Sequence, residues 1–178
     1  FGLDALDRVS DVKGDRLLEA LDEAVAARVL NEVPRAVGRY SFSHALMRET
    51  LCEELTTTRR VRLHRQIGEV LETIHSENLE SHLPELAYHF VEAAPGGDAG
   101  KAIEYATRAA ERAASLLAYE EAPRHYEMAL QVLETSDKPN EAQRCDLLLA
   151  LVDVLWSAGD EDRAKNTSLR AVSSARTL

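Results

Sequence analysis

The sequence contains few residues that break helices and no long apolar run. Of its 178 residues only 8 are glycine and 5 are proline. Alanine, leucine, glutamate and arginine are abundant, and this balance favours helix over sheet. No apolar run approaches the roughly 20 residues that a membrane-spanning helix needs. The composition therefore predicts a mostly helical protein with no membrane partner.

Cysteine is also scarce, since the chain has only 2, Cys52 and Cys145, far apart and each among helix-forming residues. We expect both to be reduced and mostly packed thiols of a cytoplasmic protein. His82 and His89 could share a helix face, with His125 further on, but no cysteine or carboxylate cluster at ligand spacing accompanies them. We therefore expect no metal site.

Catalytic motifs are missing as well. The sequence has no Gly-x-Ser-x-Gly elbow and no His-Glu-x-x-His pattern, and its one glycine pair, within 95–98, lacks the Lys-Ser/Thr of a phosphate-binding loop. The acid pairs Glu53-Glu54 and Glu120-Glu121 are adjacent, so their members point to different faces of a helix. We expect a chain that is not an enzyme and that holds no cofactor of its own.

The net charge of −10 is unevenly distributed, with −2 over residues 1–76 and −8 over residues 77–178. An acidic surface repels phosphate backbones, so nucleic acid is not an expected partner, least of all of the second part. The apolar fraction of 45% and the charged fraction of 29% are ordinary for a globular protein. A chain of this length can form one large domain or two small ones.

The first 76 residues combine helical and strand patterns. Apolar residues recur at helical spacing over 15–25, where Asp15 is placed to cap the helix. Ranges 29–33 and 39–43 alternate apolar with polar residues around a turn, which predicts two paired strands. Two further helical stripes follow, over 47–55 and 63–74. Helices with one β-hairpin predict a winged-helix domain over 1–76.

Residues 77–178 lack strand patterns and predict an array of helical repeats similar to tetratricopeptide repeats. Small residues on one face let neighbouring helices approach closely, and three expected helices carry two alanines seven residues apart. These pairs are Ala102/Ala109, Ala122/Ala129 and Ala164/Ala171. The expected helix over 141–157 is apolar around most of its circumference, so it is either central to the stack or covered by something outside the chain.

We expect this array to continue beyond Leu178, because the last helix is weakly apolar and has no polar cap. The chain starts at Phe1 without a methionine, which we interpret as the start of an excised fragment.

Several segments resemble one family. Phe42-Ser-His-Ala-Leu-Met-Arg-Glu49, with the segments 51–55, 59–64 and 68–71, looks like the winged-helix region of bacterial signal-transduction (STAND) ATPases. In that family an AAA-type or NB-ARC-like nucleotide-binding module precedes the winged helix, and tetratricopeptide-like repeats follow it. The later segments 85–90, 101–105 and 119–126 resemble those repeats. The family includes LuxR-type transcriptional regulators and ATPase-linked nucleotide cyclases.

The resemblance implies a nucleotide-sensing role for His44, because a histidine at the matching place contacts the phosphates of bound ADP. The family motif usually reads His-Asp, whereas this chain has His44-Ala45. The other interpretation of His44 is structural: its ring would order the strand-to-helix corner through a backbone hydrogen bond. The nucleotide, ATP or ADP, would be held by the upstream ATPase module of the intact protein.

Two more sets of residues are candidates for binding. The first set is a run of arginines without a neighbouring acid, Arg59, Arg60, Arg62 and Arg65. They would contact the ATPase module or its nucleotide, bind DNA, or lie in solvent opposite nearby glutamates. The second set is four tyrosines, Tyr88, Tyr105, Tyr119 and Tyr126. They would pack between repeats or line a groove for a partner.

The leading functional hypothesis is a non-catalytic regulatory segment of a signalling ATPase. It would relay nucleotide state from the ATPase module and bind an effector or protein partner through its repeats. The alternatives are a free-standing helical-repeat adaptor and, with less support from the charge, a DNA-binding winged-helix repressor.

Overall fold

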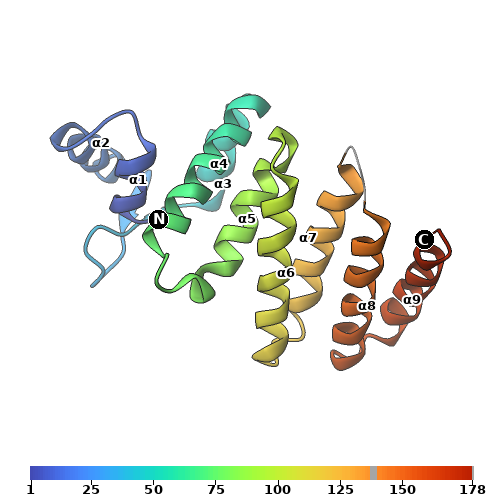
Figure 1. Cartoon of the computed structure of the whole chain (residues 1–178). Helices are drawn as coiled ribbons and strands as arrows, with labels where there is room; N and C mark the ends of the chain where they lie inside the picture. The colour runs from blue at the N-terminus through green and yellow to red at the C-terminus, as the bar shows by residue number, and fades with distance from the viewer. Residues whose placement is uncertain (137–139, 178) are drawn as a thin grey trace. The chain divides into compact units, whose positions relative to one another are not determined.

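The computed structural model describes residues 1–136 and 140–177, which are mostly helical with one small antiparallel sheet of two strands. This confirms the predicted fold class at that level. The chain divides into two compact units, residues 1–74 and residues 75–178. The sequence predicted the division two residues later, after residue 76. Figure 1 labels the elements of both units, which are described separately below.

The first unit contains four helices and one hairpin. Its elements are α1 (Leu3–Val9), α2 (Asp15–Ala26), β1 (Leu30–Glu32), β2 (Tyr40–Phe42), α3 (Ala45–Glu53) and α4 (Thr57–Ile74). The strands pair antiparallel, with Leu30 opposite Phe42 and Glu32 opposite Tyr40. The two predicted strands are thus confirmed, each somewhat shorter than expected. Helix α1 was not predicted.

The core of this unit forms between α2 and the hairpin. Leu17 and Leu21 lie one turn apart on α2 and pack with Leu30 of β1 and Tyr40 of β2. Their burial explains why the apolar positions of α2 recur every three or four residues. Apolar side chains of α1, α2 and the hairpin surround them, namely Leu3, Leu6, Ala24, Val25, Val29 and Phe42.

The start of α2 differs from the expectation. Gly14 is the residue that precedes the helix, at φ 56°, and Asp15 is the first helical residue, with no capping hydrogen bond from a side chain. The prediction that Asp15 caps α2 is therefore wrong. A positive φ suits glycine best, so Gly14 makes the turn. The carboxylate of Asp15 still interacts favourably with the positive end of the helix dipole.

The second unit is a succession of helices, and its described residues contain no strand. Its elements are the 3-10 turns η1 (Leu79–His82) and η2 (Ala94–Gly96) and the helices α5 (Leu83–Ala93), α6 (Ala99–Ser115), α7 (Ala122–Thr135), α8 (Glu141–Ser157) and α9 (Glu161–Ala175). Each helix packs against the next, and α5 also contacts α7. Figure 1 shows the helices side by side in chain order.

The alanine pairs lie where these helices meet. All six predicted alanines are buried, in α6, α7 and α9. Aromatic and leucine side chains fill the space between α5 and α6, where the ring of Phe90 stacks on that of Tyr105 with centroids 5.1 Å apart. The expected close packing through small residues is therefore confirmed.

Helix α8 is covered on one side only. Leu147, Leu148 and Leu151 are buried, whereas Leu149 and Trp156 are 52% and 48% exposed. The helix was expected to be central to the stack or to be covered by something outside the chain. Within residues 1–136 and 140–177 one apolar face of α8 remains open to solvent.

The close packing at the alanine contacts can be tested by replacing one buried alanine with a larger residue. We expect Ala129→Leu to lower the free energy of unfolding by about 1–3 kcal/mol, because a fully buried position has no room for three more carbons. Ala142→Leu, on the exposed side of α8, is the matched control and should change it by less than about 0.5 kcal/mol. Urea unfolding measures both, and equal effects would contradict the close-packed interface.

Candidate functional site

His44 lies at the corner between β2 and α3, as its sequence context predicts. It is the exposed residue that precedes α3, with extended backbone at φ −140° and ψ 139°. The corner is fixed by Ser43, whose hydroxyl donates to the carbonyl of Arg28 over 2.6 Å and whose amide donates to the carbonyl of Val29 over 3.0 Å. The imidazole makes no capping hydrogen bond. Its ring thus faces solvent and does not cap the helix.

Helix α3 buries none of its residues. Its large apolar side chains are exposed: Leu46 to 72%, Met47 to 37% and Leu51 to 46%. The helical stripe predicted from Met47 and Leu51 is therefore present, but it does not contribute to the core of the first unit. Exposed apolar patches on a protein surface often mark contacts with other molecules.

The four arginines lie along the first half of α4. Arg59 and Arg62 are exposed, and Arg60 and Arg65 are half-buried. In the described part of the chain, Arg59, Arg60 and Arg62 form no ion pair, so nearby glutamates do not neutralise them. Positive charge near a helix N-terminus opposes the helix dipole. The start of α4 therefore presents guanidinium groups that an anionic partner would stabilise.

The four tyrosines do not share one environment. Tyr105 and Tyr126 are buried, and burial raises the pKa of the Tyr126 phenol. Tyr119 is half-buried, and Tyr88 is 47% exposed on α5. Tyr105 and Tyr126 thus pack between helices, and only Tyr88 and part of Tyr119 are available to a partner.

The two cysteines are free, as expected, but only one is packed. The thiol of Cys145 is half-buried, and its Sγ lies 3.9 Å from the carbonyl oxygen of Ala171. Cys52 is exposed on α3. The expectation of a packed thiol at Cys52 is wrong, because α3 as a whole has no covering element within the first unit.

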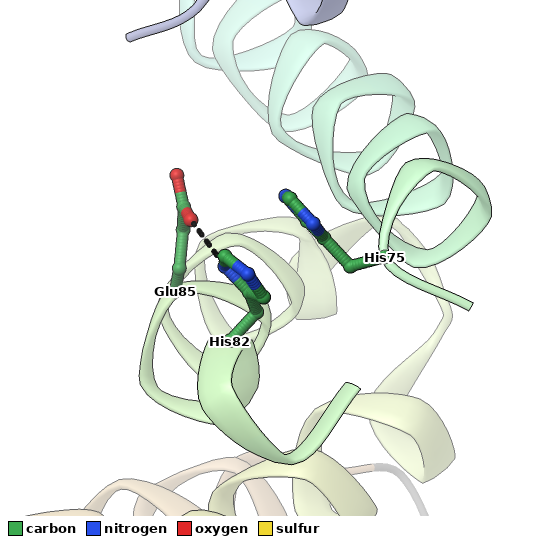
Figure 2. Close-up of side chains that lie close together, drawn as sticks. All are labelled: His75, His82 and Glu85. Carbon is green, nitrogen blue, oxygen red and sulfur yellow. Dashed lines mark ion pairs between the residues drawn. The ribbon is translucent and has the colours of Figure 1, made fainter. Parts of the chain in front are cut away.

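Three further side chains come together at the start of the second unit. The rings of His75 and His82 stack with centroids 3.4 Å apart and planes at 10°, and Nδ1 of His82 lies 3.6 Å from Oε2 of Glu85. Figure 2 shows the three side chains converging. The sequence pattern did not indicate this group, because helical spacing pairs His82 with His89 instead. His75 and His82 are also seven residues apart, but a turn lies between them, so helical periodicity does not detect that they are close in space.

A shallow hollow of about 300 Å³ lies in the first unit between α1 and α2. Its polar lining includes the carboxylates of Asp4, Asp7 and Asp15, with Arg8 as a cation. Three carboxylates repel phosphate groups, so this hollow is poorly suited to a nucleotide.

No family model matches the chain, and no curated protein or solved structure matches it either. Among the described residues, 1–136 and 140–177, none of the helices has both the length and the apolar character needed to cross a membrane.

His125 on α7 provides a pH test of the packing. Burial, followed by repulsion from Arg124, lowers its pKa below the usual 6.5, although Glu121 opposes the shift. The unfolded chain then takes up a proton more readily than the folded chain as pH falls below about 6.5. The stability that the neutral ring contributes is present above this pH and is lost below it.

We therefore expect His125→Gln to weaken the loss of stability on acidification from about pH 7 to about pH 5. The urea midpoint of both proteins, measured across this range, checks the prediction. An equally steep decrease in the variant would show that His125 does not contribute to the acid sensitivity.

Proposed function

We propose that this chain is a non-catalytic regulatory segment, in which a winged-helix domain docks on a nucleotide-binding module and helical repeats bind an effector or a protein partner. The first unit would be the winged helix, and the second would be a tetratricopeptide-like array. The module would hold ATP or ADP, and the whole would work in the cytoplasm. This proposal follows the resemblance to signal-transduction ATPases described above.

The observation that supports the proposal most is the exposure of α3 together with His44. The ring of His44 precedes a helix whose apolar side chains, Leu46 and Leu51 among them, have no cover within their unit. A docked module would bury these side chains and bring its nucleotide to the imidazole. A neutral ring can donate one hydrogen bond to a phosphate oxygen.

The arginines at the start of α4 add charge complementarity. Arg59 and Arg62 are exposed and have no acidic partner among the described residues. Phosphates or an acidic face of the module would supply the missing negative charge. Coupling would arise because the module contacts this surface differently in its ADP and ATP states.

The test uses the polypeptide that carries this segment together with its nucleotide-binding module. We expect His44→Ala to weaken ADP binding measured by calorimetry by about tenfold or more, because a hydrogen bond to a charged group contributes about 1.5–3 kcal/mol and about 1.4 kcal/mol corresponds to a factor of ten. Basal output of the intact protein should rise, because ADP holds the resting state. His89→Ala, which removes an imidazole from the second unit, is the control and should leave ADP affinity unchanged.

Unchanged ADP affinity in His44→Ala would remove the sensor role. A reading frame without a Walker-type Gly-x-x-x-x-Gly-Lys-Ser/Thr before this segment would contradict the docking proposal as a whole.

The second candidate is a helical-repeat adaptor, and the open face of α8 favours it. Leu149 and Trp156 are about half exposed on that face, and tryptophan is among the residues that contribute most to protein interfaces. In this role the second unit would bind a protein partner without any nucleotide module.

The third candidate, a DNA-binding repressor, has a direct test. We expect the 178-residue chain to cause no shift of duplex DNA in a gel at about 0.15 M salt, because its net charge is −10. A shift of random-sequence duplex at this salt would favour the DNA-binding role of the arginines on α4. The shift should then disappear in Arg59→Ala/Arg62→Ala.

A further inference from the structure

The geometry points to a binding site for a divalent transition metal at His75, His82 and Glu85, and we propose zinc as its ion. This inference is independent of the proposed function, because all three residues lie within the second unit and none belongs to α3 or α4. One ring nitrogen of each histidine and one carboxylate oxygen of Glu85 all lie within 4.8 Å of one another. Among the described residues this is the one group of three or more such donors at that distance.

The local fold holds the donors together. After α4 ends at Ile74, the amide of Asn78 donates to the carbonyl of His75 over 2.8 Å and closes a turn. The turn is followed by η1, which ends at His82, and α5 is anchored by the fully buried Leu83. His82 precedes α5, and Glu85 is in its first turn, where a carboxylate is favoured by the helix dipole. The turn after α4 and the segment η1 thus bring the ring of His82 against the ring of His75.

The donor spacing is close to what zinc requires. In a tetrahedral site with Zn–N distances of about 2.0–2.1 Å, neighbouring donor atoms lie about 3.3 Å apart. The pair formed by His82 and Glu85 is already at 3.6 Å. The stacked rings are not yet in a ligating orientation, since ring lone pairs lie in the ring planes. Figure 2 shows the two rings face to face with Glu85 beside His82, and binding would require a rotation of one imidazole to bring its nitrogen toward the other two donors.

The donor set also selects the ion. Two imidazoles and one carboxylate suit zinc and similar transition metals, whereas magnesium and calcium prefer oxygen ligands alone. Two histidines and a glutamate are one of the ligand sets of three-ligand zinc sites, which keep a fourth position for water or substrate. The side chains of His82 and Glu85 are 26% and 50% exposed, so solvent can reach that position. Bound zinc would link the side chain of His75 to Glu85 in the first turn of α5.

Calorimetry of the 178-residue chain without a polyhistidine tag tests the proposal. We expect one Zn²⁺ per chain, no binding of Mg²⁺, and a melting temperature that rises with zinc concentration. Co²⁺ should bind at the same place and show the intense visible absorption of tetrahedral coordination.

Three variants locate the site. His75→Ala and Glu85→Gln should each weaken zinc binding by more than about tenfold, because even the loss of an outer-shell partner costs about 10- to 100-fold. His89→Gln is the matched control, since it removes an imidazole from the same helix α5 and should bind zinc as the parent does. Glu85 is half exposed, so we expect Glu85→Gln to fold. Its zinc affinity then tests the site even if His75→Ala is unstable.

Two results would overturn the metal site. One is the lack of stoichiometric zinc binding by the parent chain. The other is zinc binding that Glu85→Gln leaves unchanged while circular dichroism shows a folded variant. Neither result bears on ADP binding through His44, so failure of this site and failure of the proposed function are distinguishable.

Discussion

Each of the helices α5 to α9 buries one face against a neighbouring helix. Alanine at the contact positions, such as Ala122 and Ala129 on α7, lets the backbones approach closely enough for leucine and aromatic side chains to fill the rest. The order of helices along the chain therefore becomes their order in space. This packing positions the exposed side chain of Tyr88 on α5 and the open face of α8.

The sequence predicted the features that follow from periodicity, and it missed those that depend on tertiary contacts. Apolar spacing located the hairpin and the helices from α2 to α9, because one face of each is apolar, although α3 buries none of its residues. It missed α1, which is only seven residues long and packs through Leu3 and Leu6 against elements far away in the sequence. It also assigned Cys52 to a packed position, because the pattern of α3 looks like that of a core helix.

The candidate sites also divide into one that the sequence pattern located and one that depends on tertiary contacts. His44 could be located from sequence, since a strand followed by a helix places it at a corner, and the residue is exposed there. The group of His75, His82 and Glu85 could not be located, because a turn and a 3-10 segment set the distance between the two rings. Helical spacing favoured His89 as the partner of His82, whereas the chain reversal selects His75.

The successive packing of α5 to α9 has a consequence for how this unit loses its structure. A helix such as α6 contacts a helix on each side, whereas α9 packs chiefly on α8. Each of these helices is thus stabilised chiefly by the helices beside it. The backbone amides of α6 should therefore exchange with deuterium only when its contacts with both α5 and α7 open, so their protection reports on more than one interface.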